Sequence, residues 1–305
     1  MNIVIAGGTG FIGKAIVNTF AKEGNHVYVL TRQKHADMEN ITFIPWLSAA
    51  SHPENKLRHR SIDAMINLAG DPINQGRWTK RKKEAILQSR IRATQEMIRI
   101  VGHVEQKPKA FINASAIGYY GYANEQTFTE TSPSLGNSFP SRVCQRWEEE
   151  AKKMEAFHIR TIIARIGVVM GNNGGALAKM ILPYRFFVGG TVGTGRQWIS
   201  WIHMEDLIGL IRLIIENEEI NGPINLTAPH PVTMRELGQA IGTTLNRPHW
   251  FPVPEWLMKL VFGEMSGFLL KGQKVLPEKA LQHQYPFRFS RIEAALSNLK
   301  TPPSP

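Results

Sequence analysis

Residues 2–32 read NIVIAGGTGFIGKAIVNTFAKEGNHVYVLTR, and this stretch decides the fold. A short apolar run at 2–6 leads into a glycine-rich turn, and a helical repeat follows in which Ile12, Ile16 and Phe20 share one face. A second apolar run at 26–31 completes a strand–turn–helix–strand unit. The glycines at 7, 8, 10 and 13 fit both G-x-x-G-x-x-G and G-x-G-x-x-G, which favours a tight turn that a ligand can approach closely.

The position of this turn predicts that it binds the pyrophosphate of a dinucleotide. Glycines let the backbone approach the phosphates, and the N-terminus of the following helix stabilises their negative charge. In NAD-binding proteins the second strand ends near a carboxylate that accepts the ribose hydroxyls. Here that strand ends Val29-Leu30-Thr31-Arg32, and a guanidinium suits a 2′-phosphate. We therefore predict NADP(H) rather than NAD(H) as the cofactor.

The first half of the chain alternates β-branched apolar runs with helical repeats, the pattern of a parallel sheet covered by helices. The predicted strands are Asn2–Ala6, His26–Thr31, Thr42–Pro45, Ile62–Leu68, Ala110–Ser115 and Thr161–Ile166. The clearest helix is Thr79–Val101, with Thr79 as N-cap. Its expected apolar stripe consists of Leu87, Ile91, Thr94, Ile98 and Val101. The fold class is therefore an α/β Rossmann fold with a doubly wound parallel sheet.

Beyond about residue 225 the pattern becomes helical. Two capping boxes, at 233–236 and 290–293, mark helix starts, and prolines and glycines punctuate the segment between them. We expect a nucleotide-binding domain over 1–228, to which 167–199 belong in sequence while contributing to the substrate lobe. A smaller, mostly helical C-terminal lobe over 229–300 and a frayed tail at 301–305 complete the expected organisation.

Composition limits the function classes. One cysteine excludes a disulfide within the chain, and the N-terminal apolar run is too short for a signal peptide or a membrane span, so we expect a cytoplasmic protein without membrane contact. The net charge of +11 suits either an anionic small molecule or nucleic acid. The densest basic cluster, at 80–83, has no interleaved aromatic residues, so we expect at most non-specific nucleic-acid binding. No residues have metal-ligand spacing, and the sequence does not indicate an oligomeric state.

Several motifs resemble one family. INLAG at 66–70, INASAIGYYG at 112–121, RIGVVMG at 165–171, WISWIHMEDL at 198–207 and KGQKVLPEKALQHQYPFRF at 271–289 carry the resemblance. The chain resembles an atypical branch of the extended short-chain dehydrogenase/reductase superfamily, the NADP-binding "epimerase family" of the cell-division-inhibitor-homologue type. Members of that branch end in a domain of unknown function, here at about 248–297.

The resemblance implies a cofactor site assembled from several strand ends. Trp46 is expected beside the adenine, 68–70 under the ribose and 166–168 along the nicotinamide, and Arg90 stands where sugar-nucleotide epimerases keep an asparagine. The expected cofactor-binding residues are Gly7, Thr9, Gly10, Phe11, Ile12, Gly13, Arg32, Trp46, Leu68, Ala69, Gly70, Arg90, Ser115, Ile166, Gly167 and Val168.

The helix after the fifth strand departs from the superfamily pattern. Active members carry Tyr-x-x-x-Lys there; the lysine lowers the pKa of the tyrosine and holds the nicotinamide ribose, and the tyrosine passes a proton. If Glu148 takes the place of the glutamate that usually follows, the tyrosine and lysine positions hold Pro140 and Cys144. Cys144 is then either a thiol acid or nucleophile, or a buried small hydrophobe.

Other polar side chains at strand ends are the candidate proton donors. Ser115 ends the fifth strand, Tyr119 and Tyr120 follow it, and Asp71 follows the fourth. Three of them have a structural alternative: a packed ring for Tyr120, an Asp-Pro turn for Asp71 and a backbone cap for Ser115. We expect an oxidoreductase or epimerase acting on a small, anionic or nucleotide-linked substrate. The alternative is a catalytically silent NADP(H)-binding regulator or scaffold.

Overall fold

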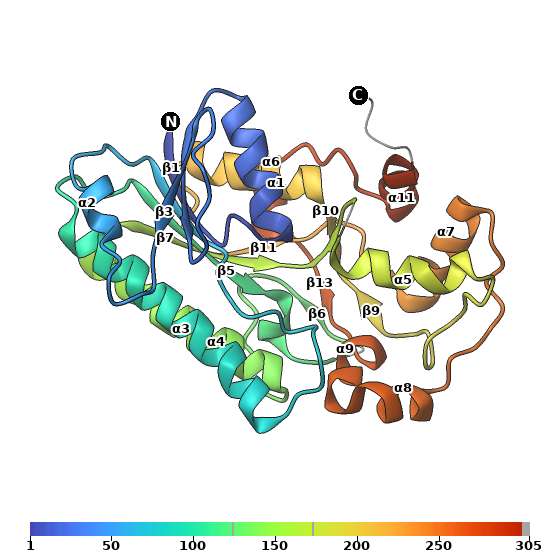
Figure 1. Ribbon diagram of the computed structural model, residues 1–305. Helices are drawn as coiled ribbons and strands as arrows, with labels where there is room; N and C mark the ends of the chain where they lie inside the picture. The colour runs from blue at the N-terminus through green and yellow to red at the C-terminus, as the bar shows by residue number, and fades with distance from the viewer. Residues whose placement is uncertain (124, 173, 301–305) are drawn as a thin grey trace.

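The protein is built around a seven-stranded parallel sheet (Figure 1). The computed structural model describes residues 1–123, 125–172 and 174–300, so the tail predicted at 301–305 lies outside the described residues. The strands lie in the order β11-β7-β5-β4-β1-β2-β3. Their bounds are β1 Asn2–Ala6, β2 His26–Thr31, β3 Ile41–Pro45, β4 Ala64–Asn67, β5 Ala110–Ala116, β7 Arg160–Ile166 and β11 Gly222–Leu226. The chain reverses direction across the sheet between β1 and β4, and doubly wound folds bind ligands at this point.

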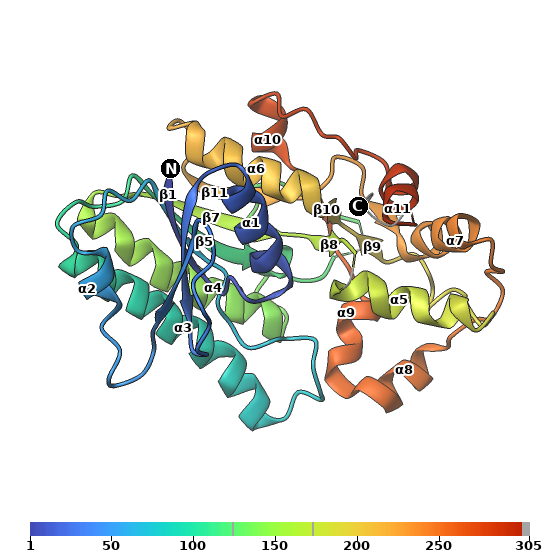
Figure 2. The same ribbon diagram turned by 45° about the horizontal axis from the view of Figure 1, so that its top comes forward.

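Helices cover both faces of this sheet (Figure 2). Side chains alternate between faces along β1, so Ile3 packs with α1 and α6 on one face, whereas Val4 packs with α3 and α4 on the other. The helices beside the sheet are α1 Phe11–Lys22, α2 Pro53–Leu57, α3 Lys80–His103, α4 Phe139–Lys152, α6 Met204–Glu216 and α10 Glu278–Gln282, with short 3₁₀ turns η1 Ile117–Tyr120 and η2 Lys153–Phe157.

The predicted fold class is confirmed, and all six predicted strands are present with bounds that differ by at most two residues. The seventh strand, β11, was not predicted. It begins with Gly222, which has a φ of +62°, and Pro223, both of which indicate a turn. A proline is tolerated here because β11 is an edge strand that pairs only with β7 within the sheet.

The predicted stripe on α3 is wrong by about one residue in its first half. Thr79 caps this helix as expected, but the buried side chain in its second turn is Ile86, while Leu87 and Ile91 are only half-buried. Both half-buried side chains line a surface groove between α3 and α4. The helix packs on α4 as well as on the sheet, so its buried face is wider than a single stripe.

The remaining elements form a smaller lobe beside the carboxyl ends of the strands (Figure 1). Its helices are α5 Gly175–Arg185, α7 Met234–Leu245, α8 Glu255–Phe262, η3 Gly263–Ser266, α9 Gly267–Leu270 and α11 Ile292–Lys300. Three two-stranded pairs join them: β6 Thr127–Phe128 with β13 Lys274–Val275, β8 Val168–Met170 with β10 Trp201–His203, and β9 Trp198–Ile199 with β12 Val232–Thr233. Leu177 of α5, Leu237 of α7 and Leu296 of α11 share one apolar cluster.

The capping box predicted at 233–236 is present at the start of α7. None of the helices in the described ranges is long and apolar enough to cross a lipid bilayer.

Candidate functional site

The glycine-rich turn between β1 and α1 has no room for side chains. Gly7 has a φ of +79°, and a Cβ there would lie 2.7 Å from the carbonyl carbon of Leu68, at the end of β4. A Cβ on Gly13 would lie 2.2 Å from the carbonyl oxygen of Gly7. Only glycine therefore allows the turn, the helix and the neighbouring strand end to approach this closely.

The N-terminus of α1 is left open to an anion. Gly10 is the N-cap and offers no side-chain acceptor, and the first turn contains no acidic residue. The backbone N–H groups of that turn therefore keep their hydrogen-bonding capacity for a ligand. Around Gly10 an added Cβ would meet only the carbonyl oxygen of Gly7, at 3.3 Å, so the backbone is accessible there. These features fit a bound pyrophosphate, as the sequence predicted.

Phe11 connects this turn to the smaller lobe. Its ring lies against Gly171, Gly174 and Gly175, which lead into α5. A Cβ on Gly174 would lie 2.6 Å from Cδ2 of Phe11. The start of α5 is therefore held next to the glycine-rich turn.

The two residues expected near the adenine half lie in different environments. Arg32 is exposed directly after β2, where its guanidinium is free to meet a phosphate. Trp46, by contrast, is 4% exposed and packs in the apolar cluster that contains Leu57 and Ile62. Little of its ring surface is left for an adenine.

A buried polar network supports the end of β4. Asn67 donates from Nδ2 to Oδ1 of Asn113 (2.7 Å) and to Oγ1 of Thr94 (3.0 Å), while its Oδ1 accepts the N–H of Ala69 (3.2 Å). The indole of Trp147 also donates to Thr94 (3.0 Å). This network fixes the loop expected under the ribose. It was not predicted, although an asparagine that closes each of the apolar runs AMIN and AFIN is a visible signal.

The loop expected along the nicotinamide is crowded at its backbone. Ile166 ends β7, and the N–H of Gly167 donates to the carbonyl of Leu226 (3.0 Å). A Cβ on Gly167 would lie 2.8 Å from the carbonyl oxygen of Ser200. Val168 then begins β8, so the loop leads directly into the smaller lobe.

Helix α4 begins with neither a tyrosine nor a lysine. Ser138 caps it, and Pro140 lies in the first turn. A Cβ on Gly118 would lie 3.3 Å from Cβ of Pro140 and 4.0 Å from Sγ of Cys144, so this turn packs directly on η1. Cys144 is 4% exposed, and burial raises the pKa of its thiol to about 11. The thiol is therefore protonated at neutral pH, which supports the small-hydrophobe alternative.

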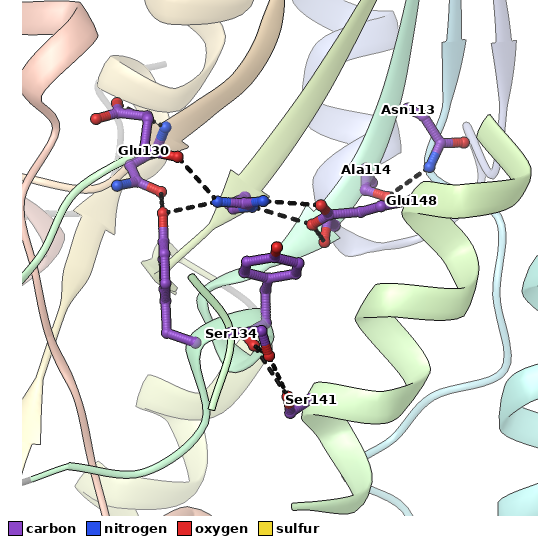
Figure 3. A network of polar contacts seen from close by, with 11 residues as sticks. Asn113, Ala114, Glu130, Ser134, Ser141 and Glu148 are labelled. Atoms are coloured by element: carbon purple, nitrogen blue, oxygen red, sulfur yellow. Dashed lines mark hydrogen bonds and ion pairs between the residues drawn. The ribbon is translucent and has the colours of Figure 1, made fainter. Parts of the chain in front are cut away.

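One turn further along α4, a buried ion pair begins a polar network (Figure 3). Glu148 accepts from Nε and Nη2 of Arg165 at 3.0 and 2.9 Å, and Ser115 donates to the same carboxylate at 2.6 Å. Burial lowers the pKa of Arg165, but the hydrogen bonds and charge of Glu148 outweigh that effect and raise it above its usual range. Ser115 is thus bonded to a buried carboxylate rather than to a backbone group, its structural alternative.

Tyr119 and Tyr120 differ in whether their hydroxyls are hydrogen-bonded within the protein. The hydroxyl of Tyr120 donates to Asn225 (2.6 Å) and accepts from Arg165 (3.1 Å), the side chain is fully buried, and burial raises its pKa to about 12. These contacts support the packed-ring alternative for Tyr120 and argue against its role as a proton donor. Tyr119 is half-buried with its ring 3.5 Å from Cζ of Arg165, and its hydroxyl has no partner among the described residues.

The basic cluster at 80–83 is partly used inside the molecule. Lys82 pairs with the carboxylate of Asp71 at 2.5 Å, and Lys83 pairs with Glu264 in the smaller lobe. The carboxylate of Asp71 is therefore paired with a lysine rather than unpaired. Within the described ranges no three histidine, cysteine, aspartate or glutamate side chains gather as metal ligands would.

Comparisons with known proteins agree with this geometry. Residues 3–227 match the "NAD dependent epimerase/dehydratase family" and residues 253–299 match a "domain of unknown function (DUF1731)". Epimerase family protein YfhF of Bacillus subtilis is 48% identical over 300 residues, which is 98% of each chain. Epimerase family protein SAR0825 of Staphylococcus aureus is 38% identical over 97% of this chain and 98% of its own.

Solved structures show the same fold. The human epimerase family protein SDR39U1, crystallised with NADPH, superimposes with a TM-score of 0.87 at 31% identity, over 98% of this chain and 99% of its own. MoeE5, crystallised with UDP-glucuronic acid and NAD, reaches a TM-score of 0.80 at 16% identity over 98% of each chain, a likeness of fold alone.

Proposed function

The chain belongs to the NAD-dependent epimerase/dehydratase family, and from that premise we propose that it is an NADP(H)-dependent oxidoreductase or epimerase whose proton donor is Tyr119. Its substrate is a small molecule, anionic or nucleotide-linked. The observation that carries the proposal is the uncapped glycine turn at the N-terminus of α1, open to a pyrophosphate. When bound, the cofactor supplies or accepts a hydride; the residues of this chain hold it and move the proton.

The preference for NADP(H) rests on Arg32. It follows β2 directly and is exposed, and no carboxylate stands at that strand end to accept the hydroxyls of an NAD ribose. The human relative crystallised with NADPH, 31% identical, supports the same choice. A guanidinium and a 2′-phosphate form a charge-assisted, bidentate pair.

Fluorescence titration with NADPH and NADH tests this preference. We expect the wild type to bind NADPH about 10- to 100-fold more tightly, and Arg32→Gln to remove most of the difference, since a hydrogen-bonded charge pair contributes about 1.5–3 kcal/mol. Arg92→Gln, an exposed arginine on α3, is the control and should leave both affinities unchanged. Tighter binding of NADH by the wild type would contradict the proposed cofactor.

The assignment of Tyr119 rests on elimination and position. It follows β5 on the ligand-binding edge of the sheet, and its hydroxyl lacks a partner in the described part of the chain, whereas that of Tyr120 is bonded twice. Ser115 and Asp71 lie near the same edge and assist only through Glu148 and Lys82. The guanidinium of Arg165 lies 3.5 Å from the centroid of the Tyr119 ring, and this cation–π contact holds the ring in place.

Measurements of turnover test the assignment of Tyr119 as the proton donor. NADPH oxidation should be followed with a panel of ketones, quinones and nucleotide sugars, and with an active substrate Tyr119→Phe should lower kcat by about 100-fold or more. Tyr120→Phe is the matched control, and it should lose stability rather than kcat. Full activity of Tyr119→Phe would rule out this donor, and tight NADPH binding without any turnover would favour the silent regulator.

A further inference from the structure

Helix α3 carries a half-buried cation, Arg90, that forms an ion pair with no carboxylate of the described residues. Arg90 donates from Nη1 to the carbonyl oxygens of Asp71 (3.0 Å) and Ile86 (2.9 Å). Its Nε and Nη2 atoms have no acceptor among the residues that the structure describes, and the nearby carboxylate of Asp71 bonds to Lys82 instead. The side chain is only half-buried, so these N–H groups are available as hydrogen-bond donors to a ligand.

The surroundings of Arg90 are the loop after β4 and helix α4. A Cβ on Gly70, just after β4, would lie 3.0 Å from Cζ and 3.1 Å from Nη1, so the backbone of the loop expected under the ribose rests directly on the guanidinium. On the other side, Cζ lies 5.0 Å from the centroid of the Trp147 ring on α4. The side chain is thus held between the loop after β4 and helix α4.

This is the part of α4 where the family pattern expects a lysine and the chain has Cys144. Trp147 is three residues further on, so both side chains lie on the same face of the helix. The Cys144 thiol is neutral at physiological pH and cannot supply the missing charge. Among the positively charged residues of α4, Arg142 and Arg146 are exposed and Lys152 lies at the far end of the helix, so none of them takes the place of that lysine.

We infer that Arg90 takes the role of that lysine, binding the hydroxyls of the nicotinamide ribose with the N–H groups that its protein contacts leave free. The fork of a guanidinium matches two adjacent hydroxyls, and its charge persists at any physiological pH. This inference rests on the proposed function, because it needs a dinucleotide in the cleft. It makes a charged side chain from α3 substitute for one lost from α4.

The test compares the binding of the whole cofactor with the binding of its adenosine half. Dissociation constants of NADPH and of 2′,5′-ADP, which lacks the nicotinamide ribose, should be measured for the wild type, Arg90→Met, Arg90→Lys and the control Cys144→Ala. We expect Arg90→Met to weaken the binding of NADPH about 10- to 100-fold, because charge-assisted hydrogen bonds are lost. The dissociation constant of 2′,5′-ADP should stay within about twofold of the wild-type value. The NADPH affinity of Arg90→Lys should lie between those of the wild type and Arg90→Met. Cys144→Ala should bind NADPH with the same affinity as the wild type.

The possible outcomes separate the two proposals. A wild type that binds neither ligand overturns the proposed function. Unchanged NADPH affinity in Arg90→Met overturns the role of Arg90 alone. Two further outcomes also overturn it, because the arginine would then only support the fold. One is an equal loss of affinity for both ligands. The other is a lowered melting temperature in both Arg90 variants, with a proportional loss of 2′,5′-ADP binding. Restored NADPH affinity in the double variant Arg90→Met, Cys144→Lys would support it independently.

Discussion

At the scale of single residues, Glu148 and Arg165 form a buried ion pair near the candidate site. Both side chains are at most 5% exposed, and three hydrogen bonds end on the carboxylate. Removing one charge would leave the other buried and uncompensated, which typically costs about 3–5 kcal/mol. We therefore expect Glu148→Gln to lower the free energy of unfolding by about that amount, measured by urea denaturation at pH 7.

The adjacent residue provides the control. Glu149 follows on the same helix with its side chain 63% exposed, and its contact with Arg146 is a surface pair. Glu149→Gln should change stability by less than about 0.5 kcal/mol. Equal effects of the two substitutions would mean that burial of the ion pair does not determine its importance.

At the scale of elements, the sequence predicted what local patterns determine and missed what depends on distant partners. The glycine spacing, the β-branched runs and the Thr79 cap predicted β1, β2 and α3 closely, because turns, propensity and caps act over a few residues. Strand β11 reads locally as a turn and becomes a strand only by pairing with β7. Its place in the sheet could not be derived from its own five residues.

The candidate site likewise has a part that the sequence predicts and a part that it does not. Its backbone part, the turn with Gly7 and Gly13, was predictable because only glycine tolerates those contacts. Its side-chain part was not, because the freedom of Tyr119 and the engagement of Tyr120 depend on Arg165 and Asn225, which lie 45 and 105 residues from Tyr120 in the chain. A sequence pattern places such residues at strand ends but does not show which hydroxyl is already bonded.

At the scale of the whole molecule, the segment after β4 ties the smaller lobe to the sheet domain. Arg77 donates to the carbonyls of Leu260 and Val261 at the end of α8, and Lys83 pairs with Glu264 just beyond it. On the opposite side Lys179 of α5 donates to the carbonyl of Asn74 (3.2 Å). The segment between β4 and Arg90 therefore contacts the smaller lobe at α5, at the end of α8 and at Glu264.

Stability of the whole fold should depend on pH through His203, the N-cap of α6. The ring is 2% exposed beside Phe289, and burial, aided by the charge of Arg288, lowers the pKa of His203 to about 4 from an ordinary value of 6.5. Below pH 6.5 the unfolded chain therefore takes up a proton that the folded chain refuses. The contribution of His203 is fully present above pH 6.5 and is lost as the pH falls towards 4, by about 3 kcal/mol for such a shift.

Two buried carboxyls act in the opposite sense, because burial raises the pKa of Glu130 and Asp206, so the pH dependence of His203 has to be isolated by substitution. His203→Asn keeps an N-cap acceptor and removes the titration. Urea unfolding of both proteins at pH 7, 5.5 and 4 should show the wild type losing about 3 kcal/mol relative to the variant across that range. Parallel stability curves would show that His203 is protonated in the folded protein, and its burial in the α6 cap would then not keep it neutral.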